Sequence, residues 1–489
     1  MEKVTELMSI CLRQKLQTIA HSLLFCTMLA GCGTGALQQN PASTPPQTSQ
    51  STTVTQLRIG DAPADQVFSF EVTIASPINL IPSGGGTASA ITVNPNRLEL
   101  TRTAAKMQPI GVMALPPGSY SAAEITIQQP SLVYAKTLLM PNPVTLIDNA
   151  DGQDQTVRIN FNPPLVVGNT PVVLNLDVNL ASAIVNDNAG NILGTHFTES
   201  SFKIGVQPIG IMGRQQDDDG EFESVTGRAI EVTAAGFVLQ TGQTGSRLPF
   251  NVDSSTTFSA GLQLANLQEQ IVEVQGFTRA DGTLYAQKIE ALGDQNASQI
   301  EGTLTTVGFN IPTLMEFIAQ DGTGTGFTSA QVGQDFLTDI SGVPSASFTT
   351  DFGDCDESAL PTPAANFPFD AAHLKGGQRI EIITENGVTQ NQPIMASQVR
   401  LQQQAISGTV SAFTALPDGT SSFDLLLPAD SYVTLLSGQT TIHVVEQSET
   451  DNRAGSLANG NVVQVRGLLF WTGTQFNMVA RRITQELEP

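Results

Sequence analysis

Hydrophobic and polar residues alternate along much of the chain after residue 55. In Phe68-Ser-Phe-Glu-Val-Thr-Ile74 the apolar side chains occupy every second position, and Leu174–Leu180 repeats this arrangement. A period of two places alternate side chains on opposite faces, which is typical of half-buried antiparallel strands. Turn sequences such as Pro116-Pro117-Gly118 separate these runs, and no long segment has a helical period. The pattern predicts an all-β protein, with a β-sandwich at residues 55–212.

After an acidic linker at residues 213–223, the chain repeats itself. Three units each open with an aliphatic-x-Gly strand, continue through an aliphatic-x-aliphatic strand and close with Ala-x-x-aliphatic. The opening strands are Val225-Thr-Gly227, Ile300-Glu-Gly302 and Ile406-Ser-Gly408, and the closing ones are Ala286–Ile289, Ala396–Val399 and Ala480–Ile483. Units of this size are small domains and not turns of a solenoid. The recurrence predicts three small β-barrels of the oligonucleotide/oligosaccharide-binding (OB) type at residues 224–293, 298–403 (with an insertion) and 404–487.

The first 54 residues differ from the rest in composition. Arg13 and Lys15 precede a short apolar run that ends in Leu29-Ala30-Gly31-Cys32. The run is shorter than the roughly 20 residues that a membrane span needs, and it has the order of a secretory signal, with Met1 or Met8 as the start. It resembles a bacterial lipoprotein signal. That resemblance implies a signal peptide at residues 1–31, cleavage before Cys32 and acylation of Cys32. Residues 32–54 are predicted to be a flexible tether.

Charge and cysteine content limit the possible partners. Removal of residues 1–31 leaves 19 basic and 43 acidic residues, a net charge of −24. Such a surface repels nucleic acid and anionic headgroups, so we expect no nucleic-acid partner. Cys355 is then the one cysteine besides Cys32, which leaves no pair for an intrachain disulfide.

Catalytic motifs are sparse. The three histidines after the signal, His196, His373 and His443, fall in different predicted domains. The chain has no Gly-x-Ser-x-Gly elbow, His-Glu-x-x-His helix or phosphate-binding Gly-x-x-x-x-Gly-Lys sequence. We therefore expect a protein that is not an enzyme and uses no cofactor. Two carboxylates that meet in a cleft could still hydrolyse a glycosidic bond, so a carboxylate-dependent hydrolase stays open.

Two further features are candidates for binding. Two acidic clusters could supply oxygen ligands to calcium, although neither has EF-hand spacing and a solvated charge run is the simpler interpretation. The candidate ligands are Asp217, Asp219, Asp354 and Asp356. Trp471, the one tryptophan, could stack on a sugar ring, although packing at a strand end is the alternative.

Short motifs connect both parts of the chain to known families. Gly60–Asp65, Leu115–Tyr120 and Leu176-Asp177-Val178 make the first block resemble the domain of unknown function 4382 family. That resemblance implies a prealbumin-like or immunoglobulin-like sandwich, found in envelope lipoproteins, with no established catalytic residues. The threefold repeat resembles the domain of unknown function 5666 family, another uncharacterised bacterial family.

Together these features predict a lipid-anchored protein of the bacterial envelope with a noncatalytic interaction or structural role. The anchor on Cys32 would hold it to a membrane, with an envelope protein or a glycan as its partner. Gly33 follows Cys32 where an aspartate would favour inner-membrane retention, so the outer membrane is expected, facing the periplasm or the cell surface. A polysaccharide-binding surface lipoprotein is the main alternative.

Overall fold

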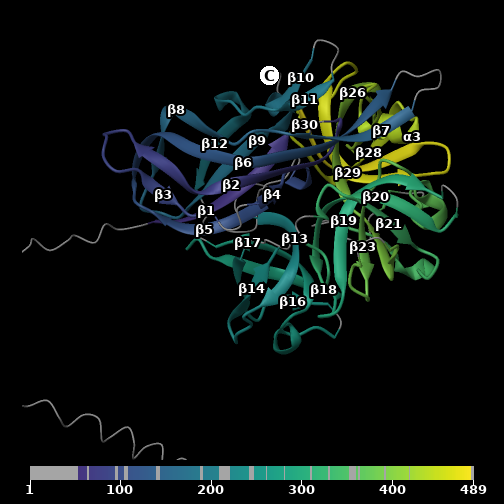
Figure 1. Ribbon diagram of the computed structural model, residues 1–489, viewed down its shortest axis with the longest axis horizontal. Helices are drawn as coiled ribbons and strands as arrows, with labels where there is room; N and C mark the ends of the chain where they lie inside the picture. Colours follow the sequence, from purple (N-terminus) through teal and green to yellow (C-terminus); the bar gives the residue numbers. More distant parts are fainter. Residues whose placement is uncertain are drawn as a thin grey trace, which may run out of the picture. The chain divides into compact units, whose positions relative to one another are not determined.

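The computed structural model describes most of the chain after residue 52 (Figure 1). The described residues are 53–62, 65–93, 97–103, 108–138, 144–187, 191–208, 221–241, 247–259, 261–279, 281–308, 311–328, 331–351, 360–361, 364–389, 392–417 and 419–485. They belong to one compact unit, residues 51–489. Strands make up most of this part, so the prediction of an all-β fold is confirmed. Within it, no helix is both long and apolar enough to cross a membrane.

The first block is a sandwich of two sheets. One sheet has the order β12-β9-β1-β5, formed by β1 (Thr53–Ala62), β5 (Gln108–Leu115), β9 (Val172–Asn179) and β12 (Phe202–Pro208). The other has the order β3-β2-β6-β7, formed by β2 (Val67–Pro82), β3 (Ser89–Ile91), β6 (Gly118–Leu138) and β7 (Val144–Asp151). β4 (Arg97–Glu99) pairs with β2, and β8 (Gln155–Val167) pairs with β6. A short helix, α2 (Leu180–Ala183), leads into the hairpin β10 (Ile184–Asn186) and β11 (Ile192–Thr195).

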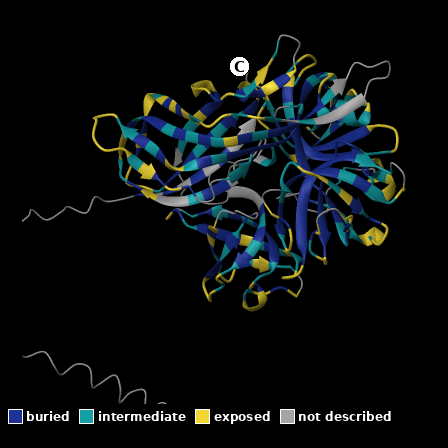
Figure 2. Cartoon of the chain, viewed as in Figure 1, coloured by how far each residue is buried: buried dark blue, intermediate teal, exposed yellow. Residues whose placement is uncertain are grey.

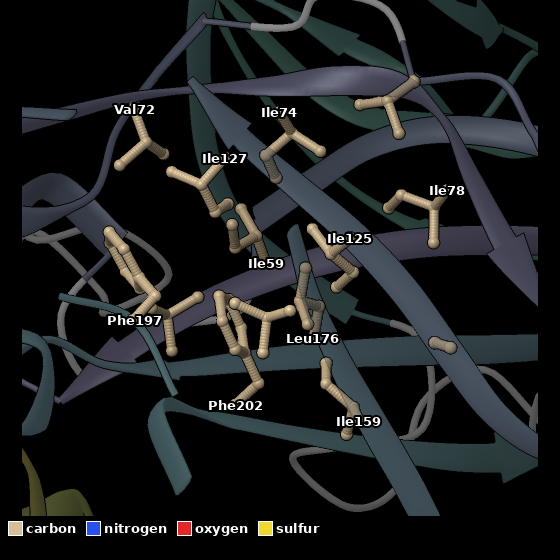
Figure 3. Packing of buried hydrophobic residues seen from close by; sticks show 14 of the residues in the cluster. Ile59, Val72, Ile74, Ile78, Ile125, Ile127, Ile159, Leu176, Phe197 and Phe202 are labelled. Atoms are coloured by element: carbon tan, nitrogen blue, oxygen red, sulfur yellow. The ribbon is translucent and has the colours of Figure 1, made fainter. Parts of the chain in front are cut away.

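The core of the sandwich lies between its two sheets. Ile59 and Leu176 from the first sheet meet Ile74 and Ile125 from the second, and all are nearly inaccessible to solvent (Figure 3). Alternate inward residues of both sheets build this core, as the period-two pattern predicts. Tyr120 joins the end of the core to the preceding turn, because its hydroxyl donates a hydrogen bond to the carbonyl oxygen of Pro116 at 2.6 Å.

Phe68 departs from the alternation predicted for its strand. The sequence places Phe68 on the inward face with Phe70, but Phe70 packs in the sandwich core whereas Phe68 packs outside it, with Val133 and Ile318. The β2–β6 pairing shifts register between Val67 and Ser69. An extra residue at a bulge reverses the direction of the side chains beside it. The prediction for Phe68 is therefore wrong, and this ring is free to contact other parts of the chain.

The next three blocks are sheets with one strand order, which we call the first, second and third barrels. The first contains β13 (Glu221–Ile230), β14 (Gly236–Gln240), β15 (Arg247–Asn251), β17 (Ile271–Thr278) and β18 (Leu284–Gly293), with a short β16 (Thr257–Phe258). It runs β15-β14-β13-β17-β18, and β15 also pairs with β18. The third is a closed barrel, β26-β27-β28-β30-β29. Its strands are β26 (Gln403–Ala415), β27 (Ser421–Leu426), β28 (Thr441–Asn452), β29 (Val462–Trp471) and β30 (Phe476–Gln485), with α3 (Tyr432–Ser437) after β27.

The second barrel keeps this order with additions. Its sheet runs β22-β25-β23-β19-β20-β21-β24. The strands are β19 (Ser298–Val307), β20 (Leu314–Gly324), β21 (Asp335–Asp339), β22 (Phe348–Thr350), β23 (Arg379–Thr384), β24 (Ile394–Met395) and β25 (Gln398–Leu401). β23 is buried at every position and β19 at its first eight, on both faces of the sheet (Figure 2). The outward faces of β19 and β23 are therefore covered by other parts of the chain.

The repeated glycine of the opening strands has a packing role in all three barrels. A Cβ on Gly227 would lie 2.5 Å from the carbonyl oxygen of Gln240, and one on Gly408 would lie 2.6 Å from that of Leu426. A Cβ on Gly302 would collide with the carbonyl oxygen of Ile318. Each glycine thus lets the first two strands of its barrel approach closely.

Gly302→Ala should destabilise the protein, because the added methyl group can fit only if β19 moves away from β20. Forced overpacking of this kind costs about 1–3 kcal/mol. Thermal unfolding measures the loss. Gly342→Ala is the matched control, since nothing lies within 4 Å of a Cβ at that position. Equal melting temperatures for Gly302→Ala and the wild type would contradict the close approach.

Candidate functional site

Several candidate residues from the sequence lie outside the described residues. These are the predicted lipid site Cys32, the calcium candidates Asp217, Asp219, Asp354 and Asp356, and Cys355. Among the residues that the structure does describe, no group of three or more histidine, cysteine, aspartate or glutamate side chains is arranged to hold a metal ion.

Trp471 lies at the end of β29 and is half-buried. Its ring meets the ring of Phe476 edge-on, with 5.1 Å between centroids. The ammonium group of Lys375 lies over the indole at 5.1 Å from the ring centroid. Residues of this chain therefore already contact the Trp471 ring at its edge and over its face. The contact with Lys375 is a favourable cation–π interaction. A sugar ring would have to compete with the Lys375 contact on that face.

The three histidines lie apart from one another in the structure. Nδ1 of His373 lies 2.8 Å from Oδ1 of Asp370, three residues earlier in the same turn. Nδ1 of His443 on β28 lies 2.9 Å from Oδ1 of Asp424 on β27, in a pair that is about 40% exposed. His196 follows β11 in the sandwich. The structure brings no two of them together.

The most concentrated chemistry is a row of charges across the outward face of the second barrel. Glu301 on β19 pairs in register with Asp321 on β20 and with Glu381 on β23. Glu381 pairs in turn with Arg400 on β25. Four adjacent strands thus place three carboxyl groups and one guanidinium side by side. The sandwich and the first barrel cover this row.

The sandwich supplies a guanidinium to one end of the row. Nε of Arg102 lies 2.9 Å from Oε2 of Glu301, and its Nη1 also pairs with Asp321. Nε of Arg379, on β23, lies 2.6 Å from the other oxygen of Glu301. Burial by itself would lower the pKa of Arg102, but Asp321 and Glu301 outweigh it and hold this pKa above its ordinary value. Burial raises the pKa of Asp321, against the opposing effect of Arg102.

Glu99 fixes the turn that presents Arg102. This turn, η1 (Thr101–Thr103), begins two residues after Glu99, the last residue of β4. Oε1 of Glu99 accepts hydrogen bonds from the amide of Phe70 and the hydroxyl of Thr101, both at 2.8 Å, and Oε2 accepts one from the amide of Arg102 at 3.0 Å. Burial raises the pKa of Glu99 to about 7, although these hydrogen bonds oppose the shift.

The first barrel meets the other end of the row. Nη2 of Arg400 donates a hydrogen bond to Oε2 of Glu273, on β17, at 2.8 Å. Nη1 of Arg400 lies 3.4 Å from both oxygens of Glu381, and Gln402 donates to Oε2 of Glu381 at 2.7 Å. Burial raises the pKa of Glu381 to about 8, and Arg400 only partly opposes this shift. We call Glu273, Glu381, Arg400 and Gln402 the Arg400 cluster.

Polar backbone contacts extend the same junction to the third barrel. The amide of Tyr432, on α3, donates to the carbonyl oxygen of Asp65 at 2.7 Å, and the amide of Ser407 donates to Oδ1 of Asp65 at 3.2 Å. The rings of Phe68 and Tyr432 are 5.4 Å apart. Gln320 of the second barrel donates to the carbonyl oxygen of Phe68. The residues at the start of β2 therefore contact two barrels at once.

Sequence reasoning missed this junction. Glu273, Glu301 and Glu381 occupy the x positions of aliphatic-x-Gly and aliphatic-x-aliphatic strands, where an outward and solvated side chain is the usual expectation. One signal was present, because Glu273 and Glu381 occupy the same position in their repeats, where Gln464 stands in the third. That signal does not predict which arginines pair with Glu273 and Glu381.

Arg102→Met should destabilise the protein strongly, because it leaves Glu301 and Asp321 buried without the cation that the sandwich supplies. Removal of one partner from a buried ion pair costs about 3–5 kcal/mol. Denaturant unfolding measures the effect. Arg158→Met is the control, since the Arg158–Glu124 pair is 51% and 38% exposed and should contribute about 1 kcal/mol or less. Equal losses in the two variants would contradict the structural role of Arg102.

Two families match parts of the chain. Residues 52–193 match the family described as Domain of unknown function (DUF4382), and residues 218–290 match Domain of unknown function (DUF5666). The matches support the predicted order of a DUF4382-like block followed by a DUF5666-like block. No curated protein matches the chain.

Solved structures with some likeness to the chain bind nucleic acid by their titles. The single-stranded DNA binding protein from Thermus aquaticus is 14% identical, with 40% of this chain and 94% of that chain covered and a TM-score of 0.15. A deletion mutant of it is 16% identical, with 40% and 95% covered and a TM-score of 0.14. A multidomain protein with nucleic acid binding domains from Streptococcus pneumoniae is 12% identical, with 53% and 72% covered and a TM-score of 0.11. These TM-scores are too low to assign a ligand to this chain.

The prediction that excludes nucleic acid as a partner is wrong as it stands: neighbours that bind nucleic acid by their titles do not bear it out, although they assign no ligand to this chain. The exclusion depended on a net charge summed over all residues after residue 31. Recognition depends on the charge and shape of one local surface, and part of the acidic charge counted in the sum, such as Glu273 and Glu381, is buried.

Proposed function

We propose that this chain is a lipid-anchored, noncatalytic protein of the bacterial envelope, in which one sandwich and three barrels form a single scaffold for contacts with other envelope components. The observation that carries the proposal is the charged row of the second barrel. Its carboxyl groups are paired with guanidinium groups that come partly from other modules, as Arg102 pairs with Glu301. Buried carboxyl groups that pair with guanidinium groups of another module keep the modules in contact, because separation would leave each charge unpaired.

Apolar contacts support the same interpretation. Phe367 and Leu401 of the second barrel pack with Leu468 and Phe470 of the third in one buried cluster. Phe68 of the sandwich packs with Ile318 of the second barrel, and Tyr432 of the third barrel packs against that cluster. Interfaces that combine a dry apolar part with paired charges behave like a divided domain core and resist separation.

The repeat gives the scaffold its regularity. We propose that the second and third barrels are further copies of the DUF5666-like unit, although the family match covers only the first. The shared strand order and the shared close approach at Gly227, Gly302 and Gly408 support this assignment. Copies of one barrel with different outward residues can pack on different neighbours.

The scaffold should unfold as one unit, because separation of the sandwich or the first barrel leaves buried charges without their partners, and separation of the third barrel exposes its apolar contacts. Scanning calorimetry of the chain without residues 1–31 should give one transition. In Arg400→Met, which leaves Glu273 and Glu381 unpaired, the first barrel should unfold in a separate step at lower temperature. Several independent transitions in the unaltered protein would overturn the proposal of a single scaffold.

The anchor can be tested in cells. Leu29-Ala30-Gly31-Cys32 supports acylation of Cys32. The full chain should incorporate a palmitate analogue and sediment with outer membranes, held by more than one acyl chain. Cys32→Ser should abolish both results, and Cys355→Ser, the control, should change neither. Continued labelling of Cys32→Ser would refute acylation of Cys32. The proposal of a single scaffold would not be affected, because calorimetry tests it independently.

A further inference from the structure

The contact between the first and second barrels contains more acid than its one shared cation can balance. We propose that this contact is a proton-dependent latch, in which the Glu381 carboxyl group keeps a proton while it is packed against Glu273 and Arg400 and loses it when the two barrels separate. The latch is a property of the fold and does not depend on the lipid anchor.

The Arg400 cluster contains two buried carboxyl groups and only one buried guanidinium group. One guanidinium lies between two carboxyl groups from different barrels, at 2.8 Å from Glu273 and 3.4 Å from Glu381. The three side chains are 9%, 1% and 2% exposed, for Arg400, Glu273 and Glu381 in turn. With both acids ionised, one negative charge would stay unbalanced in a site that water hardly reaches. Burial of such a charge is costly, and a bound proton removes it.

Other charged groups around the cluster increase the excess of acid. Asp351, after β22, and Glu301, on β19, both act on Glu381 electrostatically. Nε of Arg379, on β23, lies 2.6 Å from Oε1 of Glu301, and Nη2 of Arg379 is buried without a hydrogen-bond partner in the described structure. Glu290 on β18 stands opposite Glu273 in the β17–β18 pairing, and Lys288 pairs with Glu290 at 3.1 Å. The cations adjacent to the cluster in the described part of the chain are therefore shared with other acids.

Hydrogen bonding indicates that Glu381 is the acid that keeps the proton. Its contacts with Arg400 are long, 3.4 Å to each oxygen, and its one close donor is Gln402. Glu273 has the short contact with Arg400, although its Oε1 is buried without a hydrogen-bond partner in the described structure. The close donor of Glu273 is a guanidinium, which holds a carboxylate ionised, whereas the close donor of Glu381 is a neutral amide, so Glu381 is the easier one to protonate. The shift in the pKa of Glu381, raised by burial from 4.5 to about 8, agrees.

The direction of the pH effect follows from this proton. The closed contact binds a proton that the separated barrels release between pH 4.5, the ordinary value, and about 8. Within that window the closed form binds more protons than the open form, so closure weakens as pH rises. One proton changes the ratio of closed to open forms by about tenfold per pH unit. Below the window the contact keeps its full strength, and above pH 8 the loss is complete.

Hydrogen–deuterium exchange on the whole chain tests the latch. Protection factors for the β17 and β25 amides, corrected for intrinsic exchange, should fall by up to about tenfold per pH unit between pH 6 and 8. In Glu381→Gln, which has the shape of the protonated acid and cannot ionise, they should stay constant. Glu231→Gln, at a glutamate that is 61% exposed on the first barrel, should behave like the wild type.

A second variant covers the case in which Glu381→Gln does not fold. Glu273→Gln leaves Arg400 with one carboxyl group, so Glu381 should ionise and the pH dependence above pH 6 should disappear. Infrared spectra at pH 7 should contain a stronger protonated-carboxyl band in the wild type than in Glu273→Gln, and the difference should be the Glu381 band, because Glu99 contributes equally to both. A wild-type contact that does not vary with pH would overturn the latch, and so would a wild-type slope in Glu381→Gln or Glu273→Gln.

Discussion

The fold of this chain depends on guanidinium groups buried between carboxyl groups of neighbouring modules. Arg102 reaches from the sandwich to Glu301 and Asp321, and Arg400 reaches from the second barrel to Glu273 of the first. Arginine suits both positions, because its planar group keeps its charge when buried and offers several donors at once. Such pairs add little net stability compared with an apolar contact of the same size, but loss of one partner is costly. They therefore select one arrangement of the modules.

The second barrel is the centre of this arrangement. Its outward row of charges runs over β20, β19, β23 and β25, and these strands would face solvent in an isolated barrel. In the third barrel, Ser407 occupies the position of Glu301, and its amide contacts Asp65 of the sandwich. One strand order thus supports different contacts, because the outward residues and the added segments differ between copies.

Burial changes what the charge of this chain can predict. The net charge of −24 after residue 31 describes solubility and long-range repulsion, and it led to the exclusion of nucleic acid. Buried acids such as Glu273 and Glu381 are part of that total, although a ligand in solution does not meet them. Charge counts therefore predict partners only after burial is known.

The sequence by itself determined the all-β class and the strands, because period-two patterning and turn residues act locally. It also indicated the repeat, since the close approach of strands at Gly227, Gly302 and Gly408 requires glycine in each copy. The tertiary structure alone decided which outward residues are buried. The side chain of Phe68 lies on the opposite face of its sheet from the one predicted, because of a bulge. Glu301 pairs with Arg102, which lies about 200 residues away in the sequence. Pairings over such distances have no period in the sequence, because they depend on how separately folded sheets meet.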